Sequence, residues 1–155
     1  MHRIRVYVDT SVFGGTQDKE FSAESCRFFE QTQKGGFIIL LSAETMRELS
    51  KSPKAVREVW EGLLPEFVEE VEINSEVVEL AEEYVRSNVL KKASLSDALH
   101  VAAATVANAD LILSWNFKHI VNFNRIRGFN SVNIRLGYRS VTIMSPKEIV
   151  DESEE

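Results

Sequence analysis

Short strand-like segments alternate with helical patterns along the whole of this chain. Candidate strands lie at residues 4–8, 37–41, 67–73, 111–115 and 141–144, and those at 37–41 and 111–115 are apolar runs of the buried-strand type. Segments with helical composition or capping residues lie between them at 23–34, 43–50, 52–64, 76–87 and 95–108, and Pro146 begins a last helical turn. Strands that alternate with helices predict an α/β domain built around a mostly parallel sheet.

The length of 155 residues is sufficient for one domain with a substantial hydrophobic core. We find no repeat, no low-complexity linker and no change in composition that would divide the chain. We therefore expect one domain over residues 1–150, followed by an acidic tail at 151–155 whose charges are solvated.

Composition and charge exclude several classes of protein. No apolar run approaches the roughly 20 residues needed to cross a bilayer, and the first residues lead into a strand without a cleavable leader. From these features we expect a cytoplasmic protein without membrane contact. The single cysteine, Cys26, excludes an internal disulfide, which agrees with a reducing compartment. The net charge of −6 argues against a surface that simply coats phosphates, but it is compatible with an enzyme that works through bound cations.

Four polar side chains follow or flank the predicted strand ends. They are Asp9 after the first strand, Glu48 on the helix after 37–41, Asp97 in the first turn of the helix at 95–108, and Asn116 after 111–115. Right-handed crossovers place the carboxyl ends of parallel strands at one edge of the sheet. Oxygen ligands from separate segments suit Mg²⁺ or Mn²⁺, and two such ions can promote phosphodiester cleavage.

Each of these residues also has a purely structural interpretation. Asp9 could cap the following helix, and Glu48 could be an exposed helix carboxylate. Ser94 and Asp97 have the spacing of a capping box, in which Asp97 would accept a hydrogen bond from the Ser94 amide. Asn116 could be an ordinary turn residue. Position in the sequence alone does not decide between these interpretations and a metal site.

Four segments together resemble the PIN domain, and in particular the VapC-type toxin ribonucleases. They are VYVDTSVF, LLSAETMRELS, SLSDALHVAAATVANADLILSWNFKHI and GYRSVTIMSPKEIV, and they cover nearly the whole chain in order. The resemblance implies a three-layer α/β/α fold and a Mg²⁺- or Mn²⁺-dependent endoribonuclease that cleaves single-stranded RNA. It also implies the toxin of a toxin–antitoxin pair, with an antitoxin protein as partner and a homodimer as the assembly.

The resemblance assigns roles residue by residue. Asp9, Glu48 and Asp97 match the acidic, metal-binding positions of the family, and Thr10 or Ser11 matches the hydroxyl near the metal. Asn116 matches a fourth catalytic position at which many members have aspartate.

Three points in this assignment stay open. An amide oxygen at Asn116 binds a hard cation more weakly than a carboxylate does, so the number of metal ions is undecided. The asparagine at this position, where many members have aspartate, also permits a different function, that of a catalytically weak PIN-like module that binds RNA or a protein. Glu44 lies four residues before Glu48 on the same helix face, and the match to the Glu-Leu pair favours Glu48.

Other side chains near these motifs have less specific interpretations. His100 follows Asp97 by three residues, and we expect a hydrogen-bonded core histidine there. Trp115 and Phe117 could stack on a base, but packing against the sheet edge is favoured. Basic residues after Asn116 could form a rim for an RNA backbone or could be scattered charge; they are Lys118, Arg125, Arg127, Arg135 and Arg139.

Overall fold

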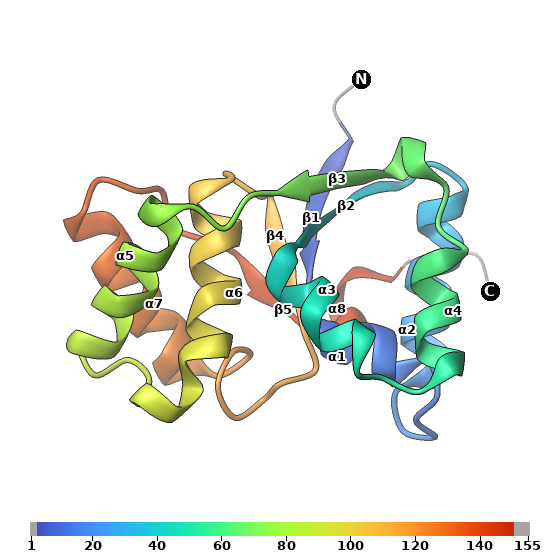
Figure 1. Ribbon diagram of the computed structural model, residues 1–155, viewed down its shortest axis with the longest axis horizontal. Coiled ribbons are helices and arrows are strands. Elements are labelled where there is room, and N and C mark those ends of the chain that lie inside the picture. Colours follow the sequence, from blue (N-terminus) through green and yellow to red (C-terminus); the bar gives the residue numbers. More distant parts are fainter. Residues whose placement is uncertain (1–2, 151–155) are drawn as a thin grey trace.

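A parallel sheet runs through the middle of the computed structural model, which describes residues 3–150. Its strands are β1 (Ile4–Val8), β2 (Phe37–Ser42), β3 (Val68–Val71), β4 (Leu111–Leu113) and β5 (Ile143–Met144). Their order across the sheet is β3-β2-β1-β4-β5, and every neighbouring pair is parallel (Figure 1). β1 is therefore the central strand, with β2 and β4 on either side of it.

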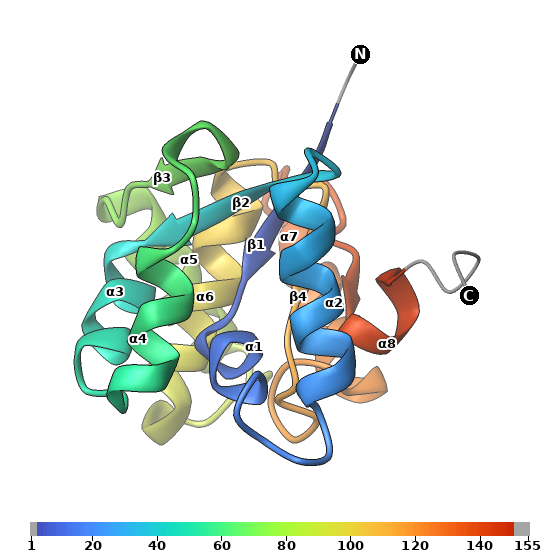
Figure 2. The ribbon, with the colours of Figure 1, turned by 90° about the vertical axis from the view of Figure 1, so that its right-hand side faces the viewer.

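Helices cover both faces of this sheet, as Figures 1 and 2 show. The helices are α1 (Thr10–Gly15), α2 (Ser22–Gln33), α3 (Ala43–Ser50), α4 (Lys54–Glu61), α5 (Ser75–Arg86), α6 (Leu95–Val106), α7 (Phe123–Arg135) and α8 (Pro146–Ile149). Short 3-10 turns lie at Pro65–Phe67 and Lys92–Ser94. The helices α5, α6 and α7 pack on one face, and α1, α2, α4 and α8 pack on the other.

Alternation along β1 explains the two cores. Val6 and Val8 point into the core beneath α1 and α2, whereas Tyr7 points into the core beneath α5 and α6. All three side chains are fully buried, as expected for the central strand of a sheet covered on both faces. The three-layer α/β/α fold with a parallel sheet is therefore confirmed.

Most predicted elements are present with small changes in their bounds. The strand at 4–8 and the helix at 43–50 have the predicted limits, whereas the strand predicted at 141–144 is only Ile143–Met144. Ser42 and Asn74 cap α3 and α5, because their side chains accept hydrogen bonds from the amides of Thr45 and Val77.

Two helices, α1 and α7, were not predicted. The sequence of α7 contains Gly128 and several asparagines, which have low helix propensity. Its helical structure depends on tertiary packing of Phe129 and Val132, which are buried in the core with α5 and α6. Gly128 lets α7 pack closely there, because a Cβ atom at this position would lie 2.8 Å from a methyl of Val89, which would have to move.

The predicted acidic tail at 151–155 lies outside the described residues. Within residues 3–150, none of the helices combines the length and the apolar composition required to cross a membrane.

Candidate metal centre

Three strand ends and one helix start bring polar side chains to a common edge of the sheet. Asp9 directly follows β1, Ser114 directly follows β4, and α3, which carries Glu48, directly follows β2. Figure 1 shows that α6 begins at the end of the molecule where β1 and β4 finish. The first two turns of α6 add Asp97 and His100 to this edge. Parallel strand order therefore brings residues from four segments together.

Asp9 is held by two hydroxyl groups. Ser11 Oγ and Ser114 Oγ each donate a hydrogen bond of 2.7 Å to Asp9 Oδ2. Asp9 occupies the N-cap position of α1, yet its side chain makes no capping hydrogen bond within residues 3–150. Helix capping therefore does not explain why this carboxylate is buried, in a residue that is only 5% exposed. Its other oxygen, Oδ1, faces His100 at 3.7 Å.

Glu48 contacts the same cluster. Its Oε1 accepts a hydrogen bond of 2.8 Å from Thr10 Oγ1 and lies 2.5 Å from His100 Nε2. Burial acts to raise the pKa of Glu48, but hydrogen bonding and the charge of His100, together with Thr10, lower it below its ordinary value. Glu48 is therefore ionised and half-buried rather than a freely exposed helix carboxylate.

Glu44 has different partners from Glu48. It forms a bidentate ion pair with Arg47 and accepts a hydrogen bond of 2.5 Å from Ser96 Oγ. Ser96 Oγ also lies 3.5 Å from Glu48 Oε2, so the two glutamates are neighbours. Because Arg47 neutralises Glu44, Glu48 is the glutamate whose charge is directed into the cluster with Asp9.

His100 completes a group of three side chains that could hold a cation. One ligand atom from each of Asp9, Glu48 and His100 lies within 4.8 Å of the other two. His100 is fully buried, and its second ring nitrogen, Nδ1, lies 2.7 Å from Tyr7 Oη. Burial alone would lower the pKa of His100, but its contacts with Tyr7, Glu48 and Asp9 raise it well above its ordinary value.

Sequence reasoning predicted a buried, hydrogen-bonded histidine at position 100 but missed its place in this cluster. The available signal was the spacing of three from Asp97, which puts both residues on one face of α6. This signal does not reveal that the ring reaches β1 and α3, because that contact depends on how α6 packs on the sheet.

Asp97 lies beside this group of three. Its Oδ1 accepts a hydrogen bond of 3.3 Å from Asn116 Nδ2, and its Oδ2 lies 3.0 Å from His119 Nδ1. Burial and the charge of Asp9 raise the pKa of Asp97, while His119 and His100 act in the opposite direction. Among the described residues, the Ser94 side chain makes no capping hydrogen bond to α6. The capping box is therefore not formed, and Asp97 faces the site.

Asn116 uses its side chain in a turn and in a contact with Asp97. Its Oδ1 accepts a hydrogen bond of 2.9 Å from the His119 amide, while its Nδ2 is directed at Asp97. The oxygen that was expected to contact a second metal ion is therefore engaged by the backbone. The turn interpretation describes the observed geometry of Asn116.

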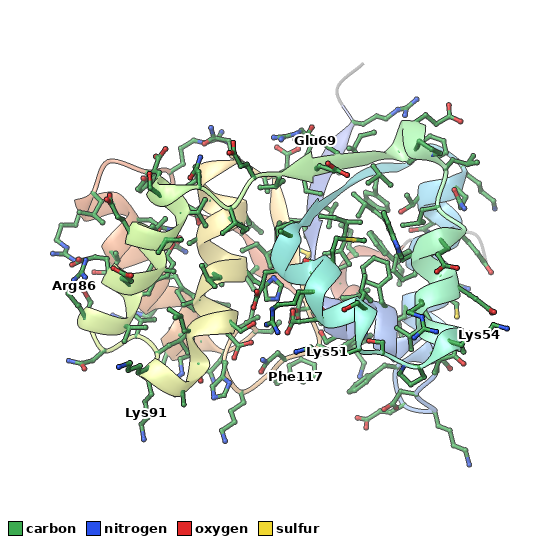
Figure 3. The ribbon with its side chains drawn as sticks, in the orientation of Figure 1. Lys51, Lys54, Glu69, Arg86, Lys91 and Phe117 are labelled. Atoms are coloured by element: carbon green, nitrogen blue, oxygen red, sulfur yellow. The ribbon has the colours of Figure 1, made fainter. Side chains whose placement is uncertain are left out.

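The aromatic residues on either side of Asn116 differ in exposure. Trp115 is buried, stacks on Phe21 with ring centres 4.1 Å apart, and donates a hydrogen bond from Nε1 to Ser25 Oγ at 2.8 Å. Packing is therefore the role of Trp115. Phe117 is 46% exposed and projects at the end of the molecule where Lys91 also lies, away from Glu69 at the other end (Figure 3).

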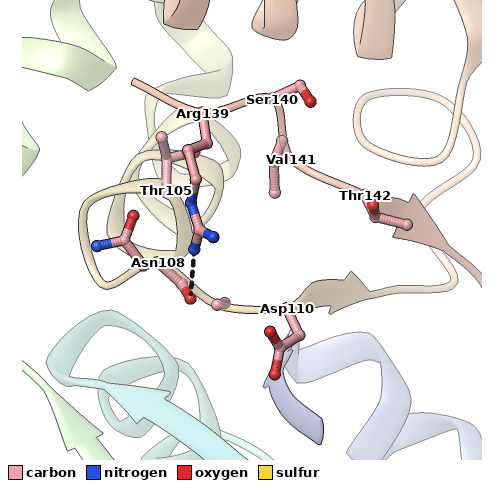
Figure 4. A pocket seen from close by; sticks show the side chains of 8 residues that line it. Thr105, Asn108, Asp110, Arg139, Ser140, Val141 and Thr142 are labelled. Atoms are coloured by element: carbon pink, nitrogen blue, oxygen red, sulfur yellow. Dashed lines mark hydrogen bonds between the residues drawn. The ribbon is translucent and has the colours of Figure 1, made fainter. Parts of the chain in front are cut away.

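The basic residues after Asn116 do not form one rim around the site. Arg135 pairs with Glu83 of α5, and Arg139 donates a hydrogen bond of 3.3 Å to the carbonyl oxygen of Asn108. Arg139 lines a pocket at the far end of α6 (Figure 4). At about 1.5 Å per helical residue, that end lies roughly 16 Å from Asp97. The hypothesis of a continuous basic rim is therefore wrong for Arg135 and Arg139.

The donor set fits a divalent cation. Two carboxylates and an imidazole from separate elements converge, and a third carboxylate lies beside them. A divalent cation bound at this partly buried place would be attracted by the gathered carboxylates. Carboxylate oxygens are the usual protein ligands of Mg²⁺ and Mn²⁺, and imidazole nitrogen is a common ligand of transition ions.

The fold and its acidic edge place the chain in the class of α/β/α domains that carry a polar site at the carboxyl ends of parallel strands. Within that class, the chain belongs to the PIN domain family, whose sequence model matches residues 6–119. The family assignment made from the motifs is therefore confirmed. No curated protein matches the chain in sequence.

Several solved structures have the same fold. VapBC2 from Rickettsia felis, bound to a DNA fragment from its promoter, has a TM-score of 0.59 and 16% identity over 92% of this chain and 98% of that chain. VapC20 from Mycobacterium tuberculosis, a toxin described as cleaving the Sarcin-Ricin loop, has a TM-score of 0.58 and 14% identity over 88% and 98%. FitAB bound to a DNA fragment has a TM-score of 0.57 and 13% identity over 95% and 99%. At these identities, the comparison establishes the shared fold.

Proposed function

We propose that this protein is a metal-dependent endoribonuclease that cleaves phosphodiester bonds in single-stranded RNA. The observation that carries the proposal is the convergence of Asp9, Glu48 and His100, with ligand atoms within 4.8 Å of one another, at the carboxyl edge of a PIN-domain sheet. Asp97 adds a carboxylate on the side of the cluster where Asn116 and His119 lie. Mg²⁺ and Mn²⁺ are the ions we propose for this site.

Asp9 and Glu48 would hold the ion, with Asp97 as the further acidic residue of the centre. When bound, a divalent ion supplies charge stabilisation at the phosphate and lowers the pKa of water. Ser11 and Ser114 fix the orientation of the Asp9 carboxylate, and Thr10 fixes that of Glu48. Such preorganisation is what a catalytic centre requires, because the charges need not be reoriented during the reaction.

Exposure of the acidic side chains indicates the direction from which a substrate would approach. The side chain of Asp9 is 8% exposed, whereas those of Asp97 and Glu48 are 22% and 30% exposed. A phosphate would therefore reach the cluster between α3 and the start of α6. Phe117 follows β4 and is exposed, so its ring offers a surface on which an unpaired base could stack.

A toxin–antitoxin role is part of the same proposal. VapBC2 and FitAB, whose fold this chain shares, were solved bound to DNA. By analogy of fold we propose an antitoxin protein as partner, a homodimer as the assembly and the cytoplasm as the location.

A second candidate function is a PIN-like module that binds RNA or a protein without efficient cleavage. Asn116 favours this candidate, because an amide stands at the fourth position and its oxygen is engaged by the His119 amide. Loss of one carboxylate reduces the affinity for a second ion, on which two-metal cleavage depends.

Cleavage of a labelled single-stranded RNA by the purified full chain separates the two functions. We expect fragments in Mg²⁺ or Mn²⁺, none in EDTA, and slower cleavage of a duplex of the same sequence. Asp9→Asn should abolish cleavage, whereas Glu82→Gln, which changes an exposed carboxylate on α5, should not. RNA binding without cleavage in any divalent ion would support the binding module instead.

A further inference from the structure

We propose that Nε2 of His100 is a direct ligand of the divalent ion, so that this site takes a first-row transition ion such as Mn²⁺, Fe²⁺ or Co²⁺ in preference to Mg²⁺. This inference rests on the metal dependence in the proposed function and specifies the chemical class of the ion. It concerns a nitrogen ligand in a centre that is otherwise built from oxygen atoms.

The direction of the imidazole ring is the first observation. Nε2 lies 2.5 Å from Glu48 Oε1 and 3.7 Å from Asp9 Oδ1, so it points between the two carboxylates that would hold the ion. Only 1% of the His100 side chain is exposed, so solvent does not satisfy this nitrogen. An ion bound by Asp9 and Glu48 would have to lie against Nε2, because the three ligand atoms occupy one small volume.

The other ring nitrogen is held as a metal-binding histidine requires. Nδ1 lies 2.7 Å from Tyr7 Oη, and that oxygen lies 2.7 Å from Ser42 Oγ. When Nδ1–H donates to Tyr7, and Tyr7 donates to Ser42, Nε2 keeps a free lone pair for a metal. Metal-ligating histidines usually make such a hydrogen bond through their second nitrogen, which fixes the tautomer and the orientation of the ring.

The hydrogen-bond partners of Tyr7 show that this arrangement is built into the fold. Tyr7 lies in the central strand and is fully buried, and its ring contacts that of His100 edge to face with centres 5.7 Å apart. Ser42 is itself buried at the end of β2. The histidine is therefore supported from two neighbouring strands, beneath the carboxylates.

A simpler role for His100 is to position Glu48 through a hydrogen bond from Nε2–H. In that case the ion would contact oxygen atoms alone. Thr10 already donates a hydrogen bond to the same Glu48 oxygen, so Glu48 has a second group that orients it. The two roles differ in one measurable property, which is whether a nitrogen atom is bonded to the ion.

The nitrogen ligand determines the selectivity for the ion. Mg²⁺ prefers an octahedral set of oxygen ligands and gives up its waters reluctantly. Imidazole nitrogen binds transition ions better, and affinity rises along the series from Mn²⁺ to Co²⁺ for sites with nitrogen and oxygen ligands. We therefore expect tighter binding of Co²⁺ than of Mn²⁺, and the weakest binding for Mg²⁺.

Pulsed EPR of Mn²⁺ added to the full chain tests the proposal directly. Nitrogen bonded to Mn²⁺ produces a ¹⁴N modulation, which should be present in the wild type and should disappear when the histidines are labelled with ¹⁵N. Labelling leaves the protein unchanged, so this measurement does not depend on the folding of a variant.

Two variants identify which histidine is the ligand. His119→Asn is the matched control, because His119 contacts Asp97 and should not be bonded to the ion; it should retain the ¹⁴N modulation. His100→Gln should lose the modulation and should bind Co²⁺ at least about 10-fold more weakly, since loss of a mere hydrogen-bonding partner of a ligand already costs about 10–100-fold.

Bound Mn²⁺ without ¹⁴N modulation in the wild type would overturn this proposal and leave the proposed function intact. Modulation that is lost in His119→Asn but kept in His100→Gln would also overturn it. Absence of Mn²⁺ and Co²⁺ binding by the wild type would contradict both the nitrogen ligand and the metal dependence of the proposed function.

Discussion

Replacement of Asp9 by asparagine should remove most of the stabilisation that a divalent ion gives to this protein. Asparagine keeps the shape of the side chain and can still accept hydrogen bonds from Ser11 and Ser114, which hold Asp9 Oδ2 in place. The substitution removes one negative charge from a buried cluster that contains Glu48. We therefore expect the stability of the metal-free protein to change by no more than about 1 kcal/mol.

The size of the metal effect follows from binding to the folded state. At about 100 times the dissociation constant, an ion stabilises the wild type by about 2.7 kcal/mol, which raises the Tm by about 5–11 °C for a domain of this length. A unit charge about 4 Å from another contributes about 4 kcal/mol at an effective dielectric constant of about 20. If the variant loses two-thirds of that interaction free energy, it binds the ion about 100-fold more weakly than the wild type does. At the same ion concentration, the variant should therefore gain only about 0.4 kcal/mol, or about 1–2 °C.

Thermal melts in EDTA and across a titration of Mn²⁺ provide the measurement. Glu82→Gln is the control for non-specific binding of ions to surface carboxylates, because Glu82 is an exposed residue of α5. It should follow the wild type throughout. Equal Tm increases in Asp9→Asn and the wild type would refute the reasoning, because the ion would then bind elsewhere.

Further substitutions test the remaining residues of the site. Asp97→Asn should abolish RNA cleavage while changing the Tm of the metal-free protein by only a few degrees; normal cleavage with a lower Tm would show a structural role alone. Glu48→Gln should reduce metal-dependent cleavage more than Glu44→Gln, since Arg47 neutralises Glu44. A larger loss in Glu44→Gln would show that Glu44, not Glu48, is the catalytic glutamate. Asn116→Asp should destabilise the metal-free protein by about 1–3 kcal/mol, because the hydrogen bond to Asp97 becomes a repulsion between carboxylates. Added Mg²⁺ or Mn²⁺ should reverse that loss of stability. Melting curves that stay superimposed on those of the wild type would show that residue 116 does not face the metal centre.

Most of the sheet could be predicted from the sequence because β4 and nearly all of β2 are continuous apolar runs and β1 is apolar except for Arg5, whereas β3 contains Glu69 and Glu70. The central strand, 4–8, and the run at 37–41 are buried on both faces, so nearly every side chain is apolar, and Asp9 interrupts the pattern where β1 ends. α7 could not be predicted in the same way. Its helix depends on contacts of Phe129 and Val132 with helices distant in the sequence, and its own residues, including Gly128, favour helix only weakly.

The candidate site could also be predicted only in part. The motifs placed Asp9, Glu48 and Asp97 near one edge, and the structure brings them to that edge from three elements. Histidine 100 was correctly predicted to be buried, yet its contact with both carboxylates depends on the packing of α6 against β1. The engagement of Asn116 by the His119 amide is a property of local turn geometry, which residue type alone leaves open.

Anomalous diffraction at the manganese edge, from crystals of the full chain grown with Mn²⁺, would locate the bound ion. We predict an anomalous peak at the carboxyl edge of the sheet, within bonding distance of the Asp9 and Glu48 carboxylates and beside Asp97. A peak bound elsewhere, with Glu48 and His100 still in direct contact as they are here, would contradict the assignment of this edge as the metal centre.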